Sequence, residues 1–379
     1  MVAHREGWMW QTCFKPPTFT WSMKDHVKES VEYTKTLDEC VQFLANDQLP
    51  RTLPEWRMDI LRCPDGEAVL YRMSHALGDG LRMLKMAKDI LAFEDGEPAE
   101  IPAVAKMNRN KEDAAEATRT NGENFKDFLT AATLAMVPNE TCDAFHQPGQ
   151  VLENDPERPR THVMADTVEL ADVKAIRTAL GEGSLNDVIL TALCGALRKY
   201  ADGLDGSASG TVRAMCAVSL PDDDDRFPNE TYNAFVMPST SLPVFGYDGD
   251  TPKRFAAVRA STAVLKRSRA GYVSAVLVAL MEKVGLDAFA GRTQKRIMGK
   301  HSLVYSNLPG FEKPVVLCES KIARIGVFFP NLLTQLSFLS YDGRLSLSVS
   351  ADAKVTKNPE KINEFFHAEI AEWKAAVVK

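Results

Sequence analysis

The sequence predicts a mixed α/β protein in two halves, residues 1–160 and residues 161–379. The first observation is length, because 379 residues exceed what a single hydrophobic core usually supports. The second is composition, since 45% hydrophobic and 25% charged residues are typical of a globular protein. The third is that both halves mix strand-type and helix-type periodicity, with no visible short-period repeat.

The first informative unit is a hairpin followed by a helix. Residues 56–62 and 67–73 alternate loosely between apolar and polar side chains, and Pro64-Asp65-Gly66 between them is a strong turn signal. Apolar residues then recur at helical spacing over 81–93. His75 therefore lies where a strand ends and a helix is about to begin, which is where open α/β sheets usually place their chemistry.

The end of the first half is less regular. Residues 95–123 are rich in Glu, Ala, Lys, Asn and Pro, which indicates an exposed linker or a solvated helix. An apolar helical pattern returns at 125–137, a loop is expected at 138–159, and 163–170 has the pattern of a strand. We place the domain boundary near residue 160.

The second half opens with a clear helix signal. Ser184 and Asn186 offer capping oxygens, Asp187 puts a negative charge in the first turn, and an apolar face follows as far as Leu197. Farther along the chain, we expect strands at 211–220, 233–239, 303–306, 336–340 and 345–349, helical structure at 255–280, and an amphipathic closing helix at 362–373.

Charge and cysteine usage exclude several functional classes. The net charge of −6 gives no electrostatic reason to bind nucleic acid. The seven cysteines are scattered, with no Cys-x-x-Cys and no metal-ligand spacing to histidine, so neither a zinc site nor a disulfide framework is expected. The four acids at 222–225 are interpreted as a solvated loop rather than a cation site. We expect no metal, and a cytoplasmic, reducing location.

Two apolar segments are too short or too polar to span a bilayer. Residues 271–281 fall short of the ~18–20 apolar residues required, and 325–341 contains Pro330, Asn331 and Gln335. Residues 1–14 do not resemble a signal peptide. Any attachment to a membrane or lipid droplet is therefore expected to be peripheral.

The segment Ser74-His75-Ala76-Leu77-Gly78-Asp79-Gly80 carries the chemical signal. In a helix, His75 and Asp79 would be a surface pair, and that structural interpretation is the simplest one for His-x-x-x-Asp alone. Gly78 and Gly80 disfavour a helix and permit a tight turn that could hold the imidazole rigidly. A histidine at a strand end suits deprotonation of an alcohol, and Asp79 would stabilise the loop.

This segment resembles the His-His-x-x-x-Asp-Gly motif of the wax ester synthase/diacylglycerol acyltransferase family. Further segments resemble that family in the expected order, and together they cover roughly residues 18 to 370. They are Asp25-His26-Val27, Leu49–Trp56, Leu185–Leu190 with Gly195–Arg198, Arg213–Leu220 with Tyr232-Asn233, Tyr305–Gly310, and Leu339–Leu345 with Ala351-Asp352. Several motifs in one order are far more specific than the histidine motif alone.

The resemblance implies two chloramphenicol-acetyltransferase-like halves with an active-site tunnel between them. It implies an O-acyltransferase that moves a long-chain acyl group from acyl-CoA, as co-substrate, to a fatty alcohol or diacylglycerol, with no bound cofactor. The catalytic motif residues would be His75 and Asp79, with His75 as general base in a direct transfer within a ternary complex. The lack of a Gly-x-Ser-x-Gly nucleophile elbow agrees with direct transfer.

Three departures from the family leave alternatives open. Ser74 stands where the family has the first of two histidines, Tyr232 stands where it has a glycine, and a strand–helix–strand region expected before Trp10 is apparently missing. One alternative is a transferase of the same superfamily with another alcohol or an amine as acceptor. The other is a non-catalytic relative that binds acyl-CoA or lipid. Oligomeric state is not predicted.

Further candidate residues each have a structural alternative. Asn233 could donate a hydrogen bond to the tetrahedral oxyanion, or could be a turn residue at a strand start. Ser306 and Asn307 could line the tunnel, or cap a turn before Pro309-Gly310. Asn186 and Asp187 are assigned to the start of a helix rather than to catalysis.

Overall fold

The structure is a computed structural model. It describes residues 22–50, 53–101, 120–133, 159–204, 211–219, 233–267 and 296–378, with gaps of one or two residues within these ranges and short pieces outside them. Residues 222–225 and Tyr232 lie outside the described residues.

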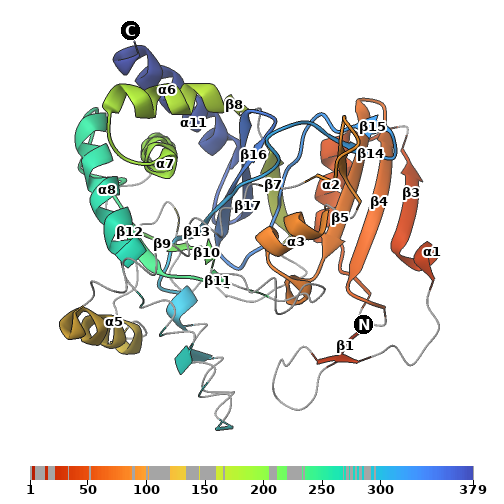
Figure 1. The fold of residues 1–379 in the computed structure, drawn as a ribbon, viewed down its shortest axis with the longest axis horizontal. Helices are drawn as coiled ribbons and strands as arrows, with labels where there is room; N and C mark the ends of the chain where they lie inside the picture. Colours follow the sequence, from red (N-terminus) through yellow and green to blue (C-terminus); the bar gives the residue numbers. More distant parts are fainter. Residues whose placement is uncertain are drawn as a thin grey trace.

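A large mixed sheet forms the centre of the molecule (Figure 1). In the described part of the chain, its strands run in the order β12-β9-β13-β16-β17-β7, and β8 also pairs with β17. β13 is parallel to both β9 and β16, and the other pairs are antiparallel. The strands are β7 (Arg160–Met164), β8 (Val168–Glu169), β9 (Val212–Cys216), β12 (Ser239–Leu242), β13 (Leu303–Leu308), β16 (Thr334–Tyr341) and β17 (Arg344–Asp352).

Helices cover one face of this sheet and enclose the main apolar core (Figure 1). They are α6 (Leu170–Leu180), α7 (Leu185–Asp202), α8 (Thr251–Arg267) and α11 (Glu360–Val377). α7 is central, and its apolar residues are buried almost all round, as expected for a helix enclosed on every side. Phe338 of β16 and Phe366 of α11 pack with their ring centroids 5.1 Å apart.

A smaller sheet holds the predicted hairpin, at the right of Figure 1. β4 (Trp56–Cys63) and β5 (Gly66–Met73) are antiparallel around Pro64-Asp65, and β3 (Val27–Val31) is parallel to β4. Gly66 has φ +150°, a conformation that L side chains rarely adopt, which explains glycine at the end of this turn. α1 (Met23–His26) precedes β3, and α2 (Leu37–Asn46) packs against β4 and β5.

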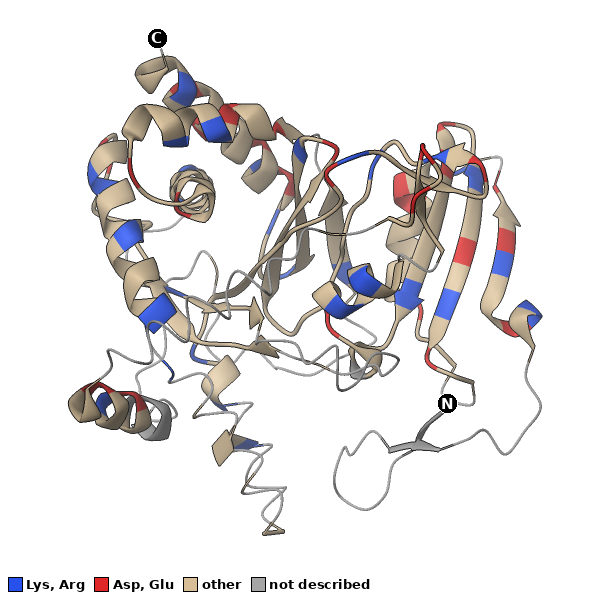
Figure 2. Cartoon of the chain, in the orientation of Figure 1, with Lys and Arg blue, Asp and Glu red and all other residues tan. Residues whose placement is uncertain are grey.

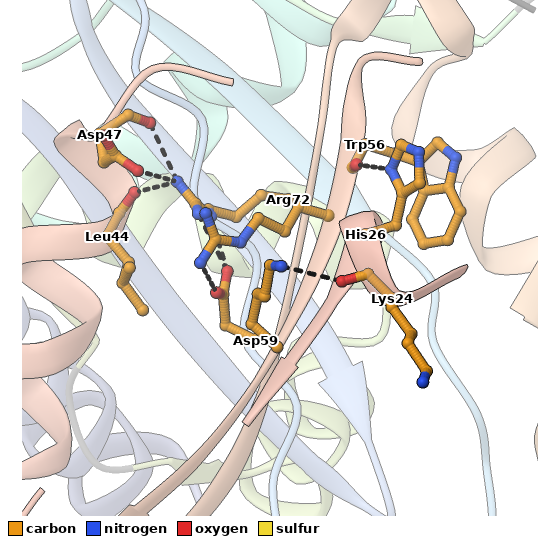
Figure 3. Close-up of polar contacts among 9 residues, drawn as sticks. Lys24, His26, Leu44, Asp47, Trp56, Asp59 and Arg72 are labelled. Carbon is orange, nitrogen blue, oxygen red and sulfur yellow. Dashed lines mark hydrogen bonds and ion pairs between the residues drawn. The ribbon is translucent and has the colours of Figure 1, made fainter. Parts of the chain in front are cut away.

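A buried carboxylate joins this sheet to α2 (Figure 3). Asp59 of β4 is fully buried and accepts a hydrogen bond from Nε of Arg72 at 3.0 Å. A nitrogen of Arg57 lies 2.8 Å from its other oxygen. The same Arg72 donates through Nη1 to the carbonyl oxygens of Leu44 and Asp47, at 2.7 and 3.0 Å. The guanidinium therefore fastens β5 both to β4 and to the end of α2.

α2 also connects the two halves. Gln42 and Asn46 donate side-chain hydrogen bonds to the carbonyl oxygen of Arg160, at 3.2 and 2.8 Å. Their side-chain oxygens accept from the backbone N–H groups of His162 and Arg160. Four hydrogen bonds thus attach the small sheet, through α2, to the edge strand of the large one.

The structure corrects two sequence predictions. The helix predicted over 81–93 ends early, since α3 covers Gly80–Ala87 and Ala92–Phe93 form β6, which pairs with β14 (Val315–Leu317). The strand predicted over 163–170 is wrong at its end, because β7 and β8 are separate and α6 begins at Leu170. At Ala92–Phe93, pairing with a distant strand outweighs the local helical pattern.

Further described elements are β1 (Val2–His4), β2 (Cys13–Lys15), α5 (Asn121–Thr133), β10 (Val218–Ser219), β11 (Phe235–Val236) and β15 (Ser320–Lys321). β10 pairs with β11, and β15 pairs with β14. Within the described residues, no helix has both the length and the apolar character needed to cross a bilayer. The predicted fold class is confirmed: the molecule is mixed α/β, in two parts with a cavity between them.

Candidate active site

His75 lies at the junction of the two halves. It follows β5 directly, in a 3₁₀ turn over His75–Leu77, and the backbone N–H of Ser74 anchors this turn to the carbonyl oxygen of Glu55 at 2.8 Å. Two rings from the second half, Phe235 and Phe329, approach the imidazole edge-to-face, with centroids 5.3 and 4.9 Å away. The turn comes from one half of the molecule, and the walls that orient the ring come from the other.

A large cavity opens beside His75. Its volume is about 2370 Å³, and its lining includes His75 and Met83 from the first half with Phe235 and Ser337 from the second. Single small-molecule sites usually have volumes of roughly 300–1,000 Å³. A cavity of this size, with many apolar side chains, is suited to two substrates of which at least one is long and apolar. Among the described residues, no hydrogen bond to the His75 ring is found.

Asp79 caps the helix that follows the motif. It is buried, and its Oδ1 accepts a hydrogen bond from the backbone N–H of Arg82 at 2.9 Å, at the start of α3. This is the geometry of an N-cap, which satisfies one of the unpaired N–H groups of the first turn. Asp79 therefore holds the end of the motif in place, as the sequence predicts for the loop.

The two motif glycines have different structural reasons. Gly78 has φ +159°, a positive value that L side chains rarely adopt, which agrees with the predicted turn. Gly80 begins α3, and a Cβ there would lie 2.9 Å from Cδ1 of Leu308 on β13. Gly80 thus permits close packing of the motif against the large sheet.

Asn233 reaches the motif from the second half. Its Nδ2 donates to the backbone carbonyl oxygen of His75 at 3.0 Å. The amide is therefore engaged with the backbone of His75. The oxyanion role of Asn233 stays a prediction, and the geometry supports a positioning role.

Ser306 and Asn307 both line the cavity at the end of β13. Asn307 donates to Oδ1 of Asn186 at 3.0 Å, and the Tyr305 hydroxyl donates to the same oxygen at 2.6 Å. Burial raises the pKa of Tyr305 well above its usual value, which keeps this hydroxyl a donor. Asn186 thus joins the start of α7 to the strand beside the cavity.

Asp187 forms a capping box with Ser184. The Ser184 N–H and Oγ each lie 2.7 Å from Oδ2 of Asp187, and Thr262 of α8 donates to Oδ1 at 2.6 Å. Although burial opposes ionisation, hydrogen bonds from Thr262 and Ser184 hold the pKa of this carboxyl below its usual value. The predicted helix-start location of Asn186 and Asp187 matches these contacts.

Sequence reasoning did not identify Phe235, Phe329 or Tyr305 as site residues. All three contact residues that are far away in the sequence, so no local residue spacing indicates that they belong to the site. The one signal available in the sequence was that Phe235 lies two residues after the candidate Asn233. Within the described part of the chain, no cluster of histidine, cysteine and carboxylate side chains could hold a metal ion.

Two family models match the chain. The one described as the wax ester synthase/diacylglycerol acyltransferase catalytic domain covers residues 23–189, and the WS/DGAT C-terminal domain covers residues 233–374. Together they span most of the chain and include every residue of the candidate site.

Individual relatives agree with these matches. A Mycobacterium tuberculosis protein provisionally named as a diacylglycerol O-acyltransferase is 26% identical, over 74% of this chain and 64% of its own length. Wax ester synthase/diacylglycerol acyltransferase 5 of Arabidopsis thaliana is 23% identical, over 86% of this chain and 72% of its own. The chain therefore spans less than two thirds of the length of its Mycobacterium relative.

Solved structures share the fold. The wax ester synthase/diacylglycerol acyltransferase of Marinobacter aquaeolei VT8 superposes with a TM-score of 0.60 at 16% identity, covering 95% of this chain and 81% of its own. A cyclization-docking bidomain of a nonribosomal peptide synthetase from Sorangium cellulosum gives 0.53 at 15% identity, covering 93% and 70%. At these identities the likeness extends to the fold alone.

Proposed function

Because the chain belongs to the wax ester synthase/diacylglycerol acyltransferase family, we propose that it is an O-acyltransferase acting on lipids. It moves a long-chain acyl group from acyl-CoA to the hydroxyl group of a fatty alcohol or diacylglycerol. The observation that carries this proposal is the location of His75, at a strand end in the wall of a cavity of about 2370 Å³ between the two halves.

His75 acts as general base in the proposed reaction. A ring nitrogen accepts the proton of the acceptor hydroxyl while the hydroxyl oxygen attacks the thioester carbonyl carbon. The tetrahedral intermediate then collapses, the C–S bond breaks, and the CoA sulfur takes the proton from the imidazolium. The products are an ester and free CoA. No acyl-enzyme forms, and no cofactor is needed.

The neighbours of His75 restrict how the ring can move. Phe235 and Phe329 contact the imidazole from the second half, and Asn233 holds the carbonyl of the same residue. An oriented base avoids the entropic cost of aligning the reacting groups. The aromatic walls also keep water from the attacking oxygen, which favours transfer over hydrolysis of the thioester.

A panel of acyl donors and acceptors tests the proposal. Release of CoA is measured for palmitoyl-CoA and acetyl-CoA with hexadecanol, diacylglycerol, a short alcohol or an amine, and the ester or amide formed is identified by mass spectrometry. We expect palmitoyl-CoA with hexadecanol or diacylglycerol to give the highest turnover. Preference for an amine or a short alcohol would assign another acceptor class. Tight acyl-CoA binding without CoA release for any acceptor would identify a non-catalytic binding protein.

A further inference from the structure

Two cysteine side chains meet between α2 and the small sheet. Cys40 lies in the middle of α2 and is buried, and Cys63 is the last residue of β4 and is half-buried. Both are free thiols. The Sγ of Cys63 donates a hydrogen bond to the Sγ of Cys40 at 3.5 Å, although the two residues are 23 positions apart in the sequence. Contacting cysteines are often plain apolar packing, so the surroundings decide whether this contact can become a bond.

α2 is fixed to the small sheet on both sides of Cys40. At the start of the helix, the backbone N–H of Leu37 donates to Oδ1 of Asp65, in the turn between β4 and β5, at 2.9 Å. At its end, the carbonyl oxygen of Leu44 accepts from Arg72 at 2.7 Å (Figure 3). These contacts hold the two sulfur atoms together without a covalent link. Reacting groups held in contact react much faster than the same groups free in solution.

A disulfide is within reach of this geometry. An S–S bond is about 2.05 Å long, so the two sulfur atoms must approach each other by about 1.5 Å. Rotation of the two side chains with a small shift of α2 supplies this movement. The hydrogen bonds at either end of the helix limit the shift, and they also keep the sulfur atoms from moving apart.

Acidic side chains near the pair slow its oxidation. Burial, the contact with Cys40 and the carboxylates of Asp65 and Glu32 raise the pKa of Cys63 to about 11. Figure 2 shows acidic segments (red) on α2 and on the small sheet, at the right of the view. Because the thiolate is the reactive form of cysteine, oxidation near neutral pH needs a sustained supply of oxidant. The pair therefore stays reduced under mild conditions.

We propose that Cys40 and Cys63 form a reversible disulfide that clamps α2 to the small sheet under oxidising conditions. Hydrogen peroxide oxidises the more accessible Cys63 to a sulfenic acid, and one water molecule leaves. The Cys40 sulfur then attacks the sulfenic sulfur, the S–S bond forms, the S–O bond breaks and a second water molecule leaves. The two thiols lose two electrons to the peroxide, and their protons leave in the two water molecules.

The clamp acts on the helix that connects the two halves. Gln42 and Asn46 of α2 are hydrogen-bonded to β7. Leu37, Val41 and Ala45 of the same helix line the cavity. A disulfide at this place restrains the small sheet and one wall of the cavity. Because it also restricts the unfolded chain, the oxidised protein should unfold at a higher temperature. None of this rests on the proposed acyltransferase function.

Peroxide treatment of the full chain tests the proposal. Mass spectrometry of a tryptic digest without reductant should find one cross-linked species that contains Cys40 and Cys63, about 2 Da lighter than the two reduced peptides together. Dithiothreitol should remove it. The midpoint of thermal unfolding should rise by about 5 °C on oxidation and return on reduction. Cys63→Ser should show neither change, whereas Cys318→Ser, at an exposed cysteine, is the matched control and should behave as the wild type does.

The variants receive the same peroxide treatment, so that damage at methionine is measured separately. Oxidation of Cys63 to sulfinic acid alone, or a disulfide between other cysteines, would overturn the proposal. A disulfide that forms without raising the unfolding midpoint would reject the clamp.

Phenylarsine oxide, which binds two neighbouring thiols, tests the pair without oxidation. The reduced wild type should bind it at least about tenfold more tightly than Cys63→Ser does. Equal binding by the two proteins would show that the sulfur atoms are apart and would contradict the proposed site.

Discussion

The large sheet packs its helical face on an extensive apolar core, whereas the small sheet β3-β4-β5 is organised around the buried carboxylate of Asp59. The large sheet is stabilised by burial of apolar surface, which does not depend on any one specific contact. The small sheet is stabilised by a few hydrogen bonds of Arg72 and by the hydrogen bonds that attach α2 to β7. The candidate base lies at the end of the second sheet. The half that presents His75 therefore depends on the other half for its position.

The largest loss of stability is expected from a substitution in the apolar core of the large sheet. Phe366→Ala removes a fully buried ring that packs on Phe338, and should lower the free energy of unfolding by about 4 kcal/mol. Urea unfolding followed by circular dichroism measures this. A loss below about 1 kcal/mol would mean that the core under α11 is loosely packed, and the contrast between the two sheets would disappear.

The small sheet should lose almost as much stability when the charge of Asp59 is removed without a change in side-chain size. Asp59→Asn leaves the guanidinium groups of Arg57 and Arg72 without their carboxylate, at a cost of about 3 kcal/mol. Glu29→Gln, in an exposed pair on the same sheet, is the matched control and should cost less than about 1 kcal/mol. Equal effects of the two substitutions would contradict the role given to Asp59.

The stability of the contact between α2 and β7 should fall at acid pH, because β7 contains His162. Burial and the positive charge of Arg160 lower the pKa of His162 from 6.5 to about 4. The unfolded chain then binds the proton more tightly, so this residue's contribution is complete above pH 6.5 and is lost as the pH falls toward 4. The loss should reach about 2 kcal/mol at pH 5. His162→Gln should flatten this part of the profile, and identical pH profiles of unfolding for the two proteins would refute the assignment.

Asn233→Ala should have the smallest effect on stability and a measurable one on rate. Loss of the hydrogen bond to the His75 carbonyl should cost about 1 kcal/mol and lower kcat about tenfold. An oxyanion donor would instead account for about 10²–10³ in kcat. Steady-state CoA release distinguishes the two roles, and a loss in the larger range would restore Asn233 as a catalytic residue.

Turn residues, residue alternation and helix-capping residues predicted the elements that depend on interactions between residues close together in the sequence. The Asp-Gly turn and the alternation around it predicted the β4–β5 hairpin, and Ser184 with Asp187 predicted the start of α7. The sequence did not predict that Ala92–Phe93 would pair with β14, because that pairing depends on a strand far along the chain.

The same division applies to the site. The motif located His75 and the loop that Asp79 stabilises, but the cap at Asp79 and the aromatic contacts of the ring were found only in the structure. Gly80 was expected for its turn conformation, and its structural reason is the nearby Leu308. Contacts of this kind follow from packing and have no signature in residue spacing.

The central claim is that His75 is the base and that its chemistry can be removed without disturbing the fold. The direct measurement is CoA release by His75→Ala beside the wild type, with the preferred donor and acceptor and with urea unfolding of both proteins. The account predicts a fall in kcat of about 10²–10⁴ with an unchanged unfolding midpoint. Near-normal turnover by a folded His75→Ala protein would contradict it.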